Sequence, residues 1–179
     1  MMALHPAVDD PVERLLGFHR RIERNLALLG RLPGHLEARG MDAEASAMAA
    51  AIVDCFGSGM ALHMDDEERD VLPLLQRRVV LPRERDALRE TVIRLHADHA
   101  EIDGLWRGLR RPLEAMAEGI ERRIGVEEIR YFRALTATHV SIEEGTIHVL
   151  AARYLRQEDR LALHERMASR RAVIKRSSH

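Results

Sequence analysis

The sequence predicts an all-α protein, an up-down four-helix bundle with an extra helix at its C-terminal end. Its 179 residues are rich in Ala, Leu, Glu and Arg and only 3% aromatic, which favours helix. Four long segments repeat apolar residues every three to four positions, with short breaks between them and no strand-like alternation. The bundle is expected over residues 10–155, and a C-terminal amphipathic helix with a frayed tail over 156–179.

The first helix is predicted to begin at residues 10–13 (DPVE). This run supplies an N-cap, a proline at the first helical position and a capping-box glutamate. Pro33-Gly34 is expected to end the helix. Its apolar stripe consists of Leu15, Phe18, Ile22, Leu26 and Leu29.

The second helix is predicted to run from near Asp42 towards Val71 and to stop or bend at Pro73. Gly57 and Gly59 are expected to weaken its middle. Its stripe includes Ile52, Phe56 and Met60.

A turn at Leu81-Pro82 leads into the third helix, which Pro112 is expected to kink or end. The fourth helix is predicted from about Val126 to Arg153, and the final helix from about Glu158 to Val173. The final helix is expected to pack across the bundle or to mediate a homodimer. The apolar stripe of the third helix is Val92, Leu95, Ile102, Trp106 and Leu109. That of the fourth helix is Ile129, Phe132, Ile142, Ile147 and Leu150, and that of the final helix is Leu161, Leu163 and Met167.

Composition excludes several classes of function. The net charge is −1 and the arginines are interspersed with acids, so nothing favours binding to nucleic acid. Cys55 is the only cysteine, so the chain can form no intrachain disulfide. The acidic N-terminus lacks the apolar core of a signal peptide, and no apolar run approaches the roughly 20 residues that span a bilayer. No membrane partner and a cytoplasmic location are therefore expected.

Each of the four bundle helices places one histidine on its apolar stripe. On the second and fourth helices a glutamate follows four residues later, on the same face and about 6 Å away at Cβ. The histidines of the two halves are separated by 44 and 40 residues, which suggests a helical hairpin used twice with pseudo-twofold symmetry. The six residues are His19, His63, Glu67, His99, His139 and Glu143.

A single histidine on an apolar face is more often a hydrogen-bonded core residue than a ligand. The His-x-x-x-acid spacing also recurs at His19-Glu23 and His99-Asp103, so it does not select a site by itself. Burying several imidazoles and two carboxylates without partners would cost several kcal/mol for each charge, and a pair of dications removes that cost. With no cysteine pair and no HExxH motif, the ligands suit iron or manganese better than zinc.

These segments resemble the hemerythrin-like family, whose HHE cation-binding domain has this pattern on a four-helix bundle. The resemblance covers about residues 10–155. It is carried by LGFHRRI, HMDDEERDVLPLL, DHAEI and HVSIEEGTIHVL, and ERMASRR near the C-terminus is similar to tails in this family. It implies two iron ions with an oxo or hydroxo bridge, with manganese as the other candidate. The resemblance makes Glu67 and Glu143 bridging carboxylates and makes His19, His63, His99 and His139 terminal ligands.

The other histidines depart from the family pattern. His96 precedes His99 as His-x-x-His, where oxygen-carrying members have His-x-x-x-His; it is either a fifth histidine ligand or a residue that supports the ligands. Those members also have His-x-x-x-x-Asp where this chain has His139 and Glu143. His148 is expected to point elsewhere. The histidines expected at the surface are His5, His35, His164 and His179.

The resemblance implies a non-haem di-iron protein that binds O2 or NO, for oxygen sensing, storage or scavenging. A dry pocket lined by Phe18, Phe56, Met60 and Trp106 is expected to protect the bound gas. One alternative is an enzyme that repairs iron–sulfur centres or reduces NO, although such repair proteins usually carry an N-terminal cysteine-containing domain and few residues precede the first helix here. The other alternative is a metal-free helical interaction module.

Overall fold

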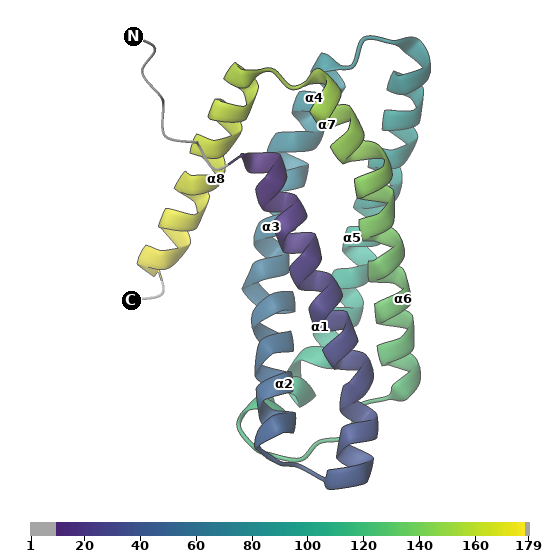
Figure 1. Ribbon diagram of the computed structural model, residues 1–179, viewed down its shortest axis with the longest axis vertical. Coiled ribbons are helices and arrows are strands. Elements are labelled where there is room, and N and C mark those ends of the chain that lie inside the picture. The colour runs from purple at the N-terminus through teal and green to yellow at the C-terminus, as the bar shows by residue number, and fades with distance from the viewer. Residues whose placement is uncertain (1–9, 178–179) are drawn as a thin grey trace.

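The computed structural model describes residues 10–177, with side chains through Val173, and contains no strand in that range. Four helical rods run alternately down and up, and a fifth helix lies outside them (Figure 1). The all-α up-down bundle is therefore confirmed. His5 and His179, expected at the surface, lie outside the described residues. The rods are α1 (Pro11–Arg39); α2 (Ala43–Asp54), α3 (Met60–Asp66) and α4 (Leu72–Arg78); α5 (Pro82–Ala117); and α6 (Val126–Ile142) with α7 (Val149–Tyr154).

Three π-helical turns join the pieces of the second and fourth rods. They are η1 (Cys55–Gly59), η2 (Glu67–Val71) and η3 (Glu143–His148). The weak middle expected at the glycines is confirmed, because Gly57 in η1 has φ −75° and ψ −112°, outside the helical region. A π turn inserts one residue and rotates the face that follows it.

Pro33 was expected to end the first helix, Pro73 to stop or bend the second, and Pro112 to kink or end the third, but none of the three ends its helix. Pro73 lies at the start of α4, directly after η2, where the widened turn accommodates the ring and its missing N–H donor. Pro33 and Pro112 lie inside α1 and α5. Each is followed by side chains that pack into the core, such as Leu36 and Leu113, and their burial outweighs a proline penalty of about 3 kcal/mol.

The first helix has the predicted start and ends at a glycine. The Asp10 carboxylate accepts a hydrogen bond from the Val12 N–H at 2.8 Å, and Pro11 occupies the first helical position. Gly40 ends α1 with φ +72°, a conformation that residues with a Cβ rarely adopt.

Two apolar clusters fill the bundle, one above the other, and a polar layer lies between them. On α1, Leu15 belongs to one cluster and Ile22 to the other, with His19 between them. On α5 the same order is Leu95, His99 and Ile102. The bundle thus places buried polar side chains at one level, and apolar side chains cover that level on both sides.

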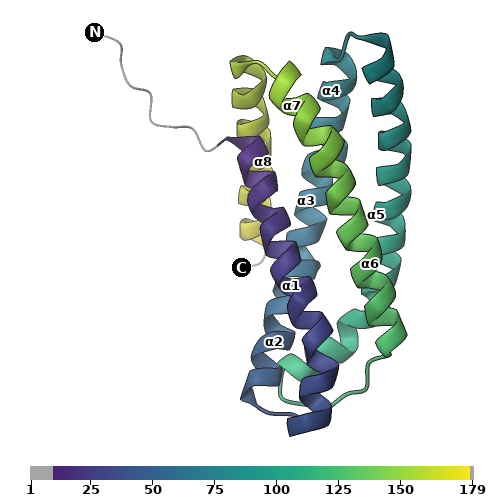
Figure 2. The same ribbon diagram turned by 45° about the vertical axis from the view of Figure 1, so that its right-hand side comes forward.

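The fifth helix, α8 (Gln157–Ser177), lies along the outside of α1 and the second rod (Figure 2). It extends beyond the end predicted at Val173, and residues 178–179 of the expected frayed tail lie outside the described residues. Leu163 and Met167 are buried as expected, whereas Leu161 is 40% exposed and does not belong to the packing stripe.

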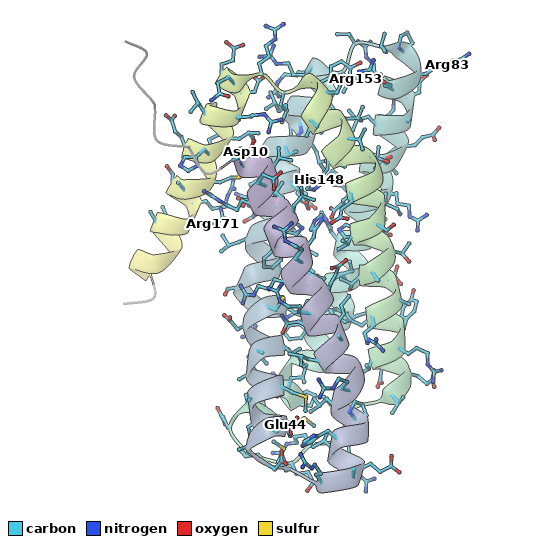
Figure 3. All side chains as sticks on the ribbon, in the orientation of Figure 1. Asp10, Glu44, Arg83, His148, Arg153 and Arg171 are labelled. Carbon is cyan, nitrogen blue, oxygen red and sulfur yellow. The ribbon has the colours of Figure 1, made fainter. Side chains whose placement is uncertain are left out.

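A cluster of ion pairs fastens α8 to the second rod. Arg170 pairs with both Asp66 and Asp70, at 2.6 Å in the case of Asp70, and Arg171 pairs with Asp66 at 2.6 Å. Figure 3 shows Arg171 reaching from α8 towards the bundle. Both aspartates are buried, and Asp66 directly precedes Glu67. The fifth helix therefore covers the part of the second rod that carries the predicted ligands.

The Arg170→Ala variant is expected to lose roughly 2 kcal/mol of stability, because each buried aspartate loses one of its cationic partners. Thermal unfolding should show a fall in Tm of roughly 4–8 °C. The matched control is Arg166→Ala, whose half-exposed guanidinium pairs with Asp70 at 2.9 Å and should matter by less than about 1 kcal/mol. Equal effects of the two variants would contradict this account of the cluster.

One helix meets a length and hydropathy criterion for crossing a membrane. The continuous rod Ala43–Arg78 has a stretch with a mean hydropathy of 1.5, although the sequence suggested no such segment. This rod packs in the bundle and carries the buried His63 and Glu67. The core helix of a soluble protein meets the same criterion, so the observation is weak evidence for a span.

Candidate metal centre

The polar layer consists of the six residues that the sequence singled out. They come from all four rods, and their side chains are only 0 to 4% exposed. Both carboxylates stand at the first residue of a π turn, Glu67 in η2 and Glu143 in η3. Such turns are frequent at functional sites. The histidines are His19 on α1, His63 on α3, His99 on α5 and His139 on α6.

Four of these residues form a first group that could hold a metal ion. The Nε2 atoms of His19 and His63 are 3.2 Å apart. Glu67 Oε1 lies 3.2 Å from His63 Nε2, and Glu143 Oε2 lies 3.1 Å from His19 Nε2. The four candidate ligand atoms all lie within 4.8 Å of one another.

A second group repeats this arrangement on the other pair of helices. The Nε2 atoms of His99 and His139 are 3.1 Å apart. Glu67 Oε2 lies 3.5 Å from His99 Nε2, and Glu143 Oε1 lies 3.0 Å from His139 Nε2. Each carboxylate thus gives one oxygen to each group, which is the arrangement needed to bridge two ions.

The short distances fit metal ligation better than hydrogen bonding. Two ligands about 2.1 Å from one ion and at right angles to each other lie about 3 Å apart. All four carboxylate oxygens of Glu67 and Glu143 are buried and have no hydrogen-bond partner in the described chain, although imidazole nitrogens approach them closely. Buried polar atoms without partners are rare in native proteins. A cation at each group would satisfy them.

The pKa shifts of the two carboxyl groups also favour a bound cation. Burial and the charge of Glu143 raise the pKa of Glu67 well above its usual value. Burial also opposes the charge of Glu143, but the imidazoles of His139 and His19 hold its pKa well below its usual value. Without a cation, therefore, the two buried carboxylates oppose each other's ionisation. A pair of dications would keep both carboxylates charged.

The pKa values of two of the imidazoles, His63 and His99, are also shifted in opposite directions. Burial lowers the pKa of His63 to about 4, so His63 is neutral at pH 7. For His99 burial acts in the opposite direction to Glu143, Glu67 and Glu68, and these carboxyls together raise its pKa to about 10. A metal ligand must be neutral imidazole, so metal binding would release the His99 proton.

Two further glutamates orient His19 and His99, a role that their positions in the sequence did not suggest. Glu144 Oε1 lies 3.1 Å from His19 Nδ1, and Glu68 Oε1 lies 2.7 Å from His99 Nδ1. Each carboxylate therefore holds the imidazole with Nε2 turned to the cluster. The signal was present in the sequence as the Glu-Glu pair that closes both His-x-x-x-Glu segments.

Replacing Glu68 or Glu144 with alanine is expected to weaken metal binding by about 10–100-fold, because the orienting carboxylate is lost while the ligands remain. Competition with a coloured chelator measures the change. Asp65→Ala is the control, since Asp65 lies on the same rod but pairs with Arg69 at the surface. If Asp65→Ala weakened binding as much as Glu68→Ala, general charge would explain the effect and the orienting role would be wrong.

The other histidines among residues 10–177 do not join the two groups. His96 is exposed on α5, away from the cluster in which a fifth ligand would have to lie. His148 was expected to point elsewhere, but it is buried with its ring centroid 5.0 Å from that of His19 (labelled in Figure 3). The π turn η3 rotates it inward, which a regular helix would not do. His35 and His164 are half-buried rather than fully exposed, and His35 Nε2 lies 2.8 Å from the Asp42 carboxylate.

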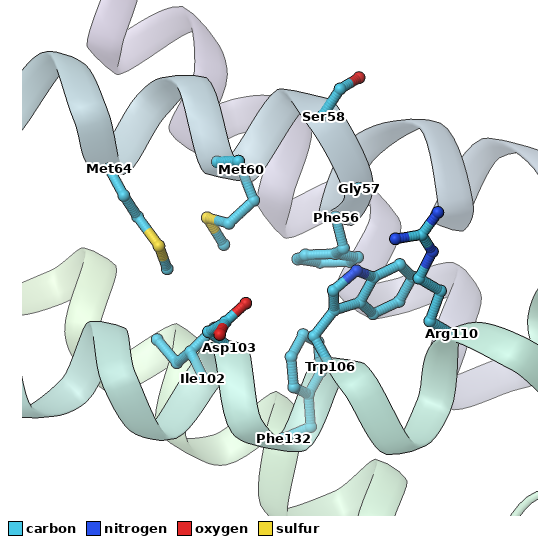
Figure 4. Close-up of a pocket in the computed structure, with 11 residues that line it drawn as sticks. Phe56, Gly57, Ser58, Met60, Met64, Ile102, Asp103, Trp106, Arg110 and Phe132 are labelled. Carbon is cyan, nitrogen blue, oxygen red and sulfur yellow. The ribbon is translucent and has the colours of Figure 1, made fainter.

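The expected dry pocket is divided into two cavities. One, of about 360 Å³, lies between the second rod and α5 and is lined by Phe56, Met60 and Trp106 among others. Figure 4 shows the thioethers of Met60 and Met64 pointing across it towards Ile102 and Asp103. Phe18 lines a separate cavity on the α1 side, so the prediction that all four residues share one pocket is wrong.

Comparison with known proteins places these features in a family. The family model described as "Hemerythrin HHE cation binding domain" matches residues 10–151. A curated protein of Haemophilus influenzae, described as "Uncharacterized protein", is 27% identical to this chain over 136 residues, which are 76% of either chain. The family match spans all six residues of the two groups and ends before α8.

Proposed function

Because this chain belongs to the hemerythrin HHE cation-binding family, we propose that it is a non-haem di-iron protein of the cytoplasm that binds O2 or NO. Oxygen sensing, storage or scavenging is the role we infer. The observation that carries the proposal is that two buried ligand groups share both of their carboxylates. The proposed ligands are His19, His63, Glu67, His99, His139 and Glu143.

The choice of iron rests on the donor atoms. Imidazole nitrogen and carboxylate oxygen suit iron and manganese, whereas a structural zinc site usually contains cysteine. Cys55 is buried in the apolar cluster below the polar layer and belongs to neither group. Two bound irons would supply a redox-active centre that exchanges electrons with a diatomic gas.

The protein's own residues have three tasks at such a centre. The neutral imidazoles would bind the ions through Nε2, and Glu144 and Glu68 fix the ring orientation of His19 and His99 by accepting from Nδ1. Glu67 and Glu143 would each offer one oxygen to either ion. The apolar clusters above and below exclude water, and the cavity beside Met60 and Ile102 offers a small apolar gas a way in (Figure 4).

Anaerobic iron loading followed by exposure to air tests the function. The expected result is a visible charge-transfer band that depends on oxygen and is absent from the His63→Ala/Glu67→Ala variant, because that variant lacks a terminal and a bridging ligand. Absorption spectra record the band, and metal analysis gives the iron content of each protein. A protein that holds two irons but shows no spectral response to O2 or NO would contradict gas binding, and a protein that takes up no iron would contradict the di-iron assignment.

A further inference from the structure

The two halves of the metal centre differ in how their histidines are held. Glu144 Oε1 lies 3.1 Å from Nδ1 of His19, and Glu68 Oε1 lies 2.7 Å from Nδ1 of His99. These two histidines occupy equivalent positions in the two hairpins, so the orienting contact is the same in both halves. The difference lies in the other histidine of each group.

The Nδ1 atoms of those other histidines, His63 and His139, are both buried and have no hydrogen-bond partner among residues 10–177. His139 nevertheless faces a carboxylate. Asp98 Oδ2 lies 3.6 Å from its Nδ1, and this oxygen is also buried without a hydrogen-bond partner. A metal on Nε2 leaves a proton on Nδ1. The Asp98 carboxylate therefore attracts the Nδ1–H group of His139 and opposes rotation of that ring.

His63 has a phenyl ring in place of that carboxylate. Phe18 on α1 corresponds to Asp98 on α5, because each directly precedes a proposed histidine ligand. The Phe18 ring packs on His63 with centroids 4.9 Å apart. The two carboxylates of the metal centre approach His63 at Nε2, so neither restrains its ring through Nδ1.

Space for movement lies beside the His63 ring. A cavity of about 270 Å³ is lined by His63, Phe18 and Gly17 among others. Two more of its lining residues, Arg21 and Arg171, are 34% and 32% exposed, so the cavity lies near the surface. The His63 ring can therefore turn away from its ion into this space.

The ion of the group that contains His63 is called the first ion, and the ion of the group that contains His139 the second ion. We propose that the first ion exchanges faster than the second, because His63 is the ligand that lets go. Loss of an orienting partner typically weakens metal binding by about 10–100-fold. The centre then keeps one iron and gives up the other to a competing chelator. The inference rests on the proposed di-iron site.

Anaerobic release of ferrous iron to a coloured chelator tests the inference. Absorbance of the iron–chelator complex should rise in two phases of equal amplitude, one for each ion, with the first faster by about tenfold or more. Crystals grown from protein recovered after the fast phase should show which ion remains. Data collected at the iron absorption edge should give a peak beside His139 and none beside His63.

Two variants act on the first ion. Phe18→Asp places a carboxylate at the position that corresponds to Asp98 and should slow the fast phase. Gly17→Leu fills the cavity beside His63 and should slow the same phase. A Cβ at Gly17 would meet only Arg20, at 3.7 Å, so α1 can accept the larger side chain.

Two variants of Asp98 act on the second ion. Asp98→Leu should speed the slow phase by about tenfold, whereas Asp98→Asn keeps an acceptor oxygen and should restore most of the wild-type rate. The matched control is Arg110→Gln, which alters the cavity between the second rod and α5 and should leave both phases unchanged. A substitution that merely loosened the bundle would change both phases together.

Release of both irons in a single phase would overturn the inference, as would crystals in which the remaining iron lies beside His63. So would a fast phase that neither Phe18→Asp nor Gly17→Leu slows, or a slow phase that Asp98→Leu leaves unchanged. A wild-type protein that takes up no iron would remove the proposed function itself, and iron analysis of the starting sample distinguishes that failure from the others.

Discussion

Replacing Glu143 with alanine is expected to remove both metal ions, whereas replacing a histidine should remove mainly one. Glu143 Oε2 belongs to the group with His19, and Oε1 belongs to the group with His139. One substitution therefore deletes a ligand from each ion and also the negative charge between them. Metal content by mass spectrometry should fall from about two per chain to well below one.

The matched control is His19→Ala, which deletes a ligand from one group only. Its metal content should fall to about one per chain, with the ion held by His99 and His139 retained. Circular dichroism should show both variants folded, because neither substitution alters the two apolar clusters that lie on either side of the polar layer. If the two variants lost the same amount of metal, Glu143 would not be shared between the ions.

Removal of bound metal is expected to destabilise the bundle strongly. At a free metal concentration about a thousand times Kd, each ion stabilises the native state by about 4 kcal/mol. Without metal, the unpartnered carboxylate oxygens and imidazoles of the polar layer remain buried. Adding a chelator should therefore lower Tm by roughly 10 °C or more in thermal unfolding followed by circular dichroism.

The His63→Ala/Glu67→Ala variant is the control for this measurement, because it lacks ligands in both groups. Its Tm should not change when chelator is added, and restoring iron to the wild type should restore Tm. A wild-type Tm indifferent to chelator would favour the metal-free interaction module instead.

The spacing of the histidines predicted the site because burial and periodicity act together. One histidine on each apolar stripe has to meet the others wherever four helices share a core, and His19, His63, His99 and His139 do so. The family pattern added the bridging carboxylates, and the two oxygens of Glu143 lie on opposite sides of the centre as that role requires.

What the sequence did not predict depends on local backbone geometry and on contacts across the bundle. A regular helix turns His148 away from the centre, and only the π turn η3 brings it to His19. Pro33 was expected to end a helix, but packing on both sides of it outweighs the local preference. The orienting role of Glu68 depends on a histidine from another rod, and no spacing within one helix reveals it.

Two metal ions are proposed to lie between Glu67 and Glu143 in the polar layer. X-ray diffraction from crystals of iron-loaded protein, with data collected at the iron absorption edge, tests it most directly. Two anomalous peaks are expected about 3.5–4 Å apart, one beside His19 and His63 and the other beside His99 and His139. Peaks at the protein surface, or none within the bundle of an iron-loaded crystal, would contradict it.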